Sequence, residues 1–132
     1  MQDVLAGLPH IITGPQPAHD VSRIFAAMDI HLSPFDDGIS TRRGSFLAGI
    51  QHGLPTVGTF GYNTSQRLLA HNNSAFVLTD AASQDKFQAM VCSLASDSGK
   101  RETMAVEARR LFEQEYAWDR IASGLLKRLP QA

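Results

Sequence analysis

Residues 29–60 decide the fold, and they read DIHLSPFDDGISTRRGSFLAGIQHGLPTVGTF. The apolar run at residues 30–32 is too short for a helix and stops before Pro34, because proline keeps the residue before it out of the helical region. We therefore predict a short buried strand at residues 30–32. The polar and small residues 36–44 that follow predict a loop.

The second half of the same stretch predicts a helix and then another strand. Phe46, Leu47 and Ile50 recur at helical spacing. Gly53 then offers a left-handed stop, and Pro55 prevents the helix from continuing. Because the residues after Pro55 have strand composition, the order strand, loop, helix, strand predicts one crossover unit of a parallel sheet.

Outside this stretch, hydrophobic periodicity alternates between strands and helices. A strand is predicted at residues 10–13, a helix at residues 18–28 and a last strand at residues 75–78. Helices then follow to the end of the chain, the last one anchored by Trp118. The predicted fold class is α/β: a three-layer Rossmann-like half with a parallel sheet of about four strands, helices on both faces, and the C-terminal helices packed across it.

Length and composition narrow the class of protein. The 132 residues, 43% of them hydrophobic, fit a single domain over residues 1–132. A net charge of −1 argues against a general nucleic-acid binder, which usually shows a clear basic surplus. Cys92 is the one cysteine, so an internal disulfide is excluded and we expect a reducing, cytoplasmic setting. No apolar run approaches the roughly 20 residues that a membrane span needs. A role at a membrane surface needs no such run and stays open.

The loop before the central helix is the candidate site. In an open parallel sheet, ligands bind outside the carboxyl ends of the strands, and this loop lies at such an end. The free N–H groups and the dipole of the helix meet there, beside Ser40, Arg42, Arg43 and Ser45. This combination favours an anionic ligand, a phosphate or a diphosphate. The histidines show no metal-ligand spacing, and we expect neither a metal nor a cofactor.

Each of these residues also has a plainer interpretation. Arg42 and Arg43 could form a solvated surface pair, although two cations at the start of a helix oppose its dipole. Asp37 and Gly38 could simply form a turn, because aspartate and glycine are favoured in turns for steric reasons. Ser40, Thr41 and Ser45 could cap the helix.

Several motifs, taken in order, resemble a known family. They are Thr13-Gly14 before an amphipathic helix, AMDIHLSP at residues 27–34 leading to Asp37-Gly38, GLPTV at residues 53–57, and YAWDRIA at residues 116–122. Together they resemble the C-terminal, donor-binding domain of GT-B-fold glycosyltransferases of the group 1 type. The likeness covers nearly the whole chain.

The resemblance implies that the loop after Pro34 and the following helix hold the diphosphate and ribose of a nucleotide-diphosphate sugar. Asp37-Gly38 stands where many family members have Glu-Gly. The family's second glutamate has no acidic counterpart, since counting from Asp37 gives Ser45 and counting back from Gly53 gives Ala48. The expected donor-binding residues, with no catalytic residue among them, are Asp37, Gly38, Ile39, Ser40, Arg42, Arg43, Gly44 and Ser45.

The resemblance also implies a parent protein, a glycosyltransferase of the hexosyltransferase type that acts on a glycan or lipid-linked acceptor. The family's N-terminal domain, which binds the acceptor and supplies the catalytic base, is missing in front of Met1. We therefore expect a fragment that is inactive alone, whose parent could associate peripherally with a membrane. Apolar surface left uncovered should make the fragment self-associate. Two other functions stay open: half of a sugar-nucleotide epimerase, and a non-catalytic assembly module.

Overall fold

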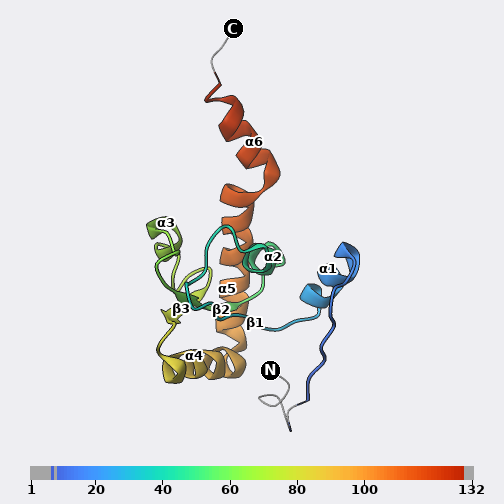
Figure 1. The fold of residues 1–132 in the computed structure, drawn as a ribbon, viewed down its shortest axis with the longest axis vertical. Coiled ribbons are helices and arrows are strands. Elements are labelled where there is room, and N and C mark those ends of the chain that lie inside the picture. Colours follow the sequence, from blue (N-terminus) through green and yellow to red (C-terminus); the bar gives the residue numbers. More distant parts are fainter. Residues whose placement is uncertain (1–6, 8, 130–132) are drawn as a thin grey trace.

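The computed structural model describes residue 7 and residues 9–129 of the chain (Figure 1). In chain order its elements are α1 (Ala18–Ala26), β1 (His31–Ser33), α2 (Gly44–Gln51), β2 (Thr56–Phe60), α3 (Gln66–Leu69), β3 (Val77–Asp80), α4 (Gln84–Ser96), α5 (Ser98–Leu111), the π-helical segment η2 (Phe112–Tyr116) and α6 (Trp118–Leu126). The strand, loop, helix and strand predicted for residues 29–60 are β1, the loop after it, α2 and β2. The order of these elements is confirmed, with each boundary within one or two residues of the prediction. The prediction that the first strand is buried is wrong for Leu32, which is 47% exposed because successive strand residues point to opposite faces.

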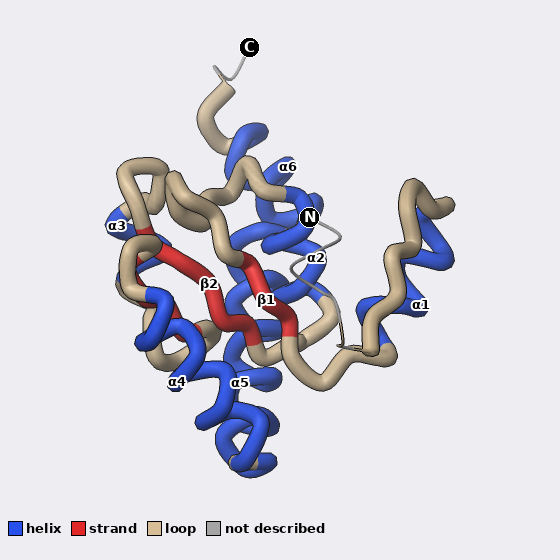
Figure 2. The backbone as a smooth tube through the Cα atoms, turned by 60° about the horizontal axis from the view of Figure 1, so that its bottom comes forward, coloured by secondary structure: helices blue, strands red, loops and turns tan. Residues whose placement is uncertain are grey.

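The strands form one parallel sheet in the order β1-β2-β3 (Figure 2). His31 is in register with Thr56, and Val57 is in register with Val77. All three strands therefore end at the same edge of the sheet, and the loops that follow them lie next to one another there. The predicted α/β class with a parallel sheet is confirmed.

The prediction of a strand at residues 10–13 is wrong. These residues have no regular structure, and the side chains of Ile11 and Ile12 are 89% and 67% exposed. An apolar pair becomes a strand only where a neighbouring strand can bond to it, and this segment runs beside α1, away from the sheet (Figures 1 and 2). Within the described part of the chain the sheet has three strands, not about four.

Helices cover both faces of the sheet, as predicted. Successive strand residues point to opposite faces, so Val57 and Leu78 face different layers. Val57 packs in a cluster with Leu94 of α4. Leu78 packs in a second cluster with Phe46 of α2 and with α3 and α5 residues. Figure 2 shows α4 on the near side of the strands, and α2 and α5 on the far side.

The C-terminal helices follow the prediction only in part. α5 packs on the core through the buried residues Ala108 and Leu111. α6 instead contacts η2 and projects away from the sheet (Figure 1), and Trp118 is 82% exposed. The extended backbone of Ala117, with φ −62° and ψ 140°, ends the preceding helix and turns the chain outward. Trp118 is therefore not a packing anchor within the described structure, and that prediction is wrong.

His31 is a buried titratable residue at the start of β1. Its Nδ1 lies 3.4 Å from Thr56 Oγ1, and its Nε2 lies 3.3 Å from Ser33 Oγ. Thr56 Oγ1 donates its own proton to the Leu54 carbonyl at 3.0 Å, so Nδ1 is the donor and Nε2 accepts from Ser33. Burial lowers the pKa of His31 below its ordinary value of 6.5, so the imidazole is neutral at pH 7.

This burial makes the stability of the fold depend on pH. The unfolded chain binds a proton at His31 near pH 6.5, whereas the folded chain binds it only at lower pH. We expect the unfolding free energy to fall below pH 6.5 by up to about 1.4 kcal/mol per pH unit, until the folded-state pKa is reached. Urea denaturation at about pH 7.5 and about pH 5.5 measures this, with His31→Gln as the control that cannot titrate. An equal loss of stability in both proteins would contradict the assignment to His31.

Candidate functional site

The loops that follow β1 and β2 line an open cavity of about 610 Å³ at the carboxyl edge of the sheet. Its lining residues are Ser40, Thr41, Arg42, Arg43, Tyr62, Asn63, Thr64 and Ser65. A volume of this size is in the range of small-molecule sites in proteins. The location is the one at which open parallel sheets bind their ligands.

Two glycines bring the backbones of these loops together. Gly38 has a φ of +85°, and a Cβ atom there would collide with the backbone N of Gly61. A Cβ atom on Gly61 would in turn lie 2.6 Å from the carbonyl carbon of Asp37. Neither position has room for a side chain, so the loops approach this closely only because both residues are glycine.

Hydrogen bonds fix the two loops at that distance. The N–H of Ile39 donates to the Thr59 carbonyl at 2.8 Å, and the N–H of Asn63 donates to the Asp37 carbonyl at 3.0 Å. Thr64 Oγ1 donates to the Ile39 carbonyl at 2.9 Å. These hydrogen bonds join the two loops, which form the two walls of the cavity, into one unit. The Asp37-Gly38 segment is a turn, closed by the 3.0 Å bond from the Gly38 N–H to the Phe35 carbonyl.

The carboxylate of Asp37 is fully engaged inside the protein. Arg43 Nη2 donates to both of its oxygens at 2.5 Å, and Asn63 Nδ2 donates to Oδ2 at 2.7 Å. The Asn63 hydrogen bond, followed by the hydrogen bond and charge of Arg43, lowers the pKa of Asp37 below its usual value. The guanidinium carbon of Arg43 also lies 4.4 Å from the centre of the Phe35 ring. Asp37 and Nη2 of Arg43 therefore hold the loop, and the charge of Arg43 is balanced within the protein.

Arg42 differs from its neighbour. It lines the same cavity and is exposed, and among the described residues it forms no hydrogen bond or ion pair. Ser40 and Thr41 beside it likewise have hydroxyl groups without a partner in the described structure. Of the two arginines predicted to bind the ligand, Arg42 is therefore the one whose side chain is available to it.

The start of α2 has no side-chain cap. Arg43 occupies the N-cap position without a capping hydrogen bond, and the first turn contains no acidic residue. Within the described structure no side chain caps this helix start, so the interpretation of Ser40, Thr41 and Ser45 as caps is wrong. The first N–H groups of α2 remain available to an acceptor.

The other predicted residues lie in different surroundings. Ile39 is completely buried in the core, so only its backbone belongs to the loop wall. Gly44 and Ser45 are exposed in the first turn of α2 and do not line the cavity.

The sequence prediction did not include the wall contributed by the loop after β2. The residues of this wall follow the strand predicted after Pro55, and they are Tyr62, Asn63, Thr64 and Ser65. A signal for their role was available, because neighbouring parallel strands place their following loops side by side.

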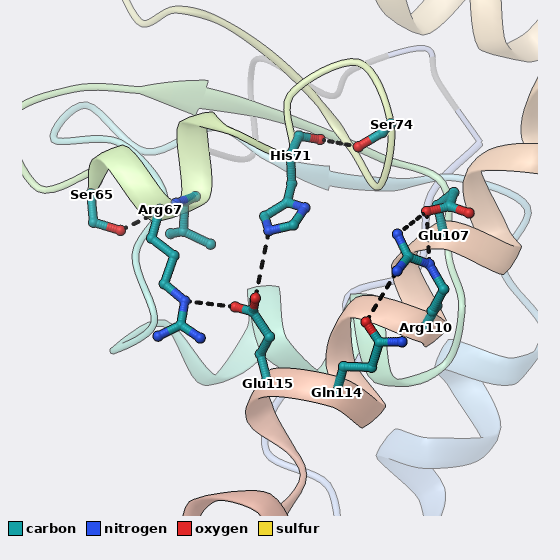
Figure 3. A network of polar contacts seen from close by, with 9 residues as sticks. Ser65, Arg67, His71, Ser74, Glu107, Arg110, Gln114 and Glu115 are labelled. Carbon is teal, nitrogen blue, oxygen red and sulfur yellow. Dashed lines mark hydrogen bonds and ion pairs between the residues drawn. The ribbon is translucent and has the colours of Figure 1, made fainter. Parts of the chain in front are cut away.

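Side chains beyond the cavity hold this second wall in place. Ser65 Oγ accepts a hydrogen bond from the Leu68 N–H at 3.3 Å and so caps α3. Arg67 of α3 donates to Glu115 Oε2 at 2.8 Å, and His71 Nε2 lies 3.8 Å from Glu115 Oε1. Figure 3 shows both side chains pointing towards Glu115, which comes from η2. The cavity wall is therefore linked through α3 to the C-terminal part of the chain.

Comparison with known proteins assigns no family. No family model matches this sequence, and no curated protein matches it. Among the described residues, no group of three or more His, Cys, Asp or Glu side chains could hold a metal ion. In the part of the chain that the structure describes, no helix is both long enough and apolar enough to cross a membrane.

Gly38→Ala tests the contact between the loops. Alanine at a φ of +85°, in collision with Gly61, should lower the unfolding free energy by roughly 2 kcal/mol or more. Gly44→Ala is the matched control, because a Cβ atom there meets nothing within 4 Å and should change stability by less than about 1 kcal/mol. Urea denaturation of the two variants measures the difference, and equal stabilities would argue against a close approach of the loops.

Proposed function

We propose that this chain binds the nucleotide-diphosphate sugar donor of a glycosyltransferase. The single observation that supports this most is an exposed Arg42, without an ion-pair partner among the described residues, in a cavity at the carboxyl edge of a parallel sheet. A guanidinium fork donates two parallel hydrogen bonds to a phosphate. The sequence motifs that resemble the GT-B family, taken in their order, suggest that this phosphate belongs to a nucleotide-diphosphate sugar.

The surroundings of Arg42 suit a diphosphate in several ways. The hydroxyl groups of Ser40 and Thr41 and the first N–H groups of α2 can all donate to phosphate oxygens. Two adjacent arginines at a helix start oppose the helix dipole. Asp37 compensates the charge of Arg43, whereas no carboxylate of the described part of the chain pairs with Arg42. A phosphate next to Arg42 supplies the compensating charge that the second arginine lacks.

The proposed role of this chain is donor binding, not catalysis. In the parent protein, a hexosyltransferase, a second domain holds a glycan or lipid-linked acceptor and supplies the catalytic base. The glycosyl group passes from the donor to that acceptor, and the nucleoside diphosphate stays with Arg42 until it is released.

Binding measurements with Arg42 variants test the proposal. Titration with pyrophosphate, UDP, GDP and ADP should give saturable binding, which Arg42→Ala weakens about 10- to 100-fold because a charge-assisted hydrogen bond is lost. Arg42→Lys should bind with intermediate affinity, since it keeps the charge without the fork. Arg23→Ala, which removes an exposed arginine of α1, is the matched control and should bind like the original chain. No binding of any of these anions to the folded protein would refute the proposal.

The helix surfaces at the two ends of the chain fit the same proposal. No residue of α1 or α6 is buried. The exposed apolar side chains of the C-terminal segment are Trp118, Ile121, Leu125, Leu126 and Leu129. Trp118, Ile121 and Leu125 recur at helical spacing along α6, and an exposed apolar helix face is usually covered by another protein surface. In the parent protein the acceptor domain covers these apolar side chains. In the isolated chain a second copy of the chain covers them instead.

Light scattering tests the self-association of the isolated chain. We expect the average mass to rise with concentration towards a dimer, and Leu125→Glu to shift the chain to a monomer by placing a charge in the interface. Val106→Glu is the control, because Val106 on α5 is 66% exposed, comparable to the 61% of Leu125, but lies outside α6. A chain that stays monomeric at high concentration would rule out this arrangement.

A further inference from the structure

Tyr62 is an exposed aromatic residue within the cavity that contains Arg42. It lies in the loop after β2 and is 87% exposed. Among the described residues, its ring stacks on no other aromatic ring, and its hydroxyl has no hydrogen-bond partner. A large amphipathic ring is therefore available to a ligand in a cavity whose other lining residues are polar or charged.

The residues on either side of Tyr62 are fixed, although Tyr62 itself is not engaged. Gly61 lies against the backbone of Asp37. Asn63 bonds to Asp37 twice, through its backbone N–H at 3.0 Å and its side-chain Nδ2 at 2.7 Å. Because both neighbours are held on the loop after β1, the backbone of Tyr62 is also held, with its side chain directed away from the core. The backbone of Tyr62 is therefore preorganised, so little backbone freedom is lost when a ligand covers the ring.

We infer that Tyr62 is a stacking surface for the base of a nucleoside diphosphate whose phosphates are held at Arg42. The inference rests on the proposed function and extends it by naming the base as a recognised part of the ligand. Every base has a flat π-face, so a tyrosine ring binds it with little dependence on base identity. The cavity of about 610 Å³ has room for a phosphate group and a base together. Stacking of this kind strengthens binding about 10- to 100-fold.

Pairs of probes separate the base from the phosphate. AMP and ribose 5-phosphate differ in the base alone, whereas ADP and pyrophosphate differ in the whole nucleoside, the base together with the ribose. We expect the ligand with the base to bind about 10- to 100-fold more tightly in each pair. Tyr62→Leu should remove most of this difference, whereas Tyr62→Phe should keep it. The affinity for pyrophosphate should be the same in all three proteins.

NMR gives a readout that a purely structural role of Tyr62 would not change. The ring protons of Tyr62 should shift upfield when ADP binds, and should stay in place when pyrophosphate binds. If nucleotides bind equally well to Tyr62→Leu, the base lies elsewhere, and this inference is overturned while the proposed function stands. If neither pyrophosphate nor any nucleotide binds, the proposed function fails and the inference fails with it.

Discussion

The close contact between the backbones of Gly38 and Gly61 is the constraint on which the candidate site depends. It joins the loop after β1 to the loop after β2, and no residue with a side chain fits at either position. The hydrogen bonds from Ile39 and Asn63 then hold the joined loops against the end of the sheet. Because both walls of the cavity belong to this one unit, its shape is fixed before any ligand arrives, and its residues need little rearrangement to bind.

The same loop unit gives two adjacent arginines different roles. Arg43 bonds to Asp37 and lies over the Phe35 ring, so its charge is balanced within the protein. Arg42 has no such partner in the described structure and lines the cavity. The uncapped start of α2 adds further donors beside it. Positive charge and free N–H groups without an internal acceptor are the basis for proposing a phosphate ligand.

The sequence predicted the features that depend on local signals. Pro34, Gly53 and Pro55 interrupt regular structure wherever they occur, so the unit from β1 to β2 could be predicted. A strand needs a neighbouring strand to pair with. The sequence around Ile11 and Ile12 does not show whether such a strand lies beside them in the fold. The different roles of Arg42 and Arg43 could not be predicted from the sequence either, because they depend on where the folded loop places Asp37. To predict that Tyr62 and the residues after it line the cavity, the order of the strands in the sheet must be known, and the folded structure supplies that order.

The central claim is that a phosphate group occupies the cavity between these two loops, next to Arg42. The most direct measurement is a titration of the ¹⁵N-labelled chain with pyrophosphate, followed through the backbone amides and the arginine Nε–H signals. We expect the largest shifts at the amides of residues 40–46 and 62–65 and at Arg42 Nε, with the Arg43 Nε signal changing little. Shifts centred on another surface of the folded protein, or no shifts at millimolar pyrophosphate, would contradict the account.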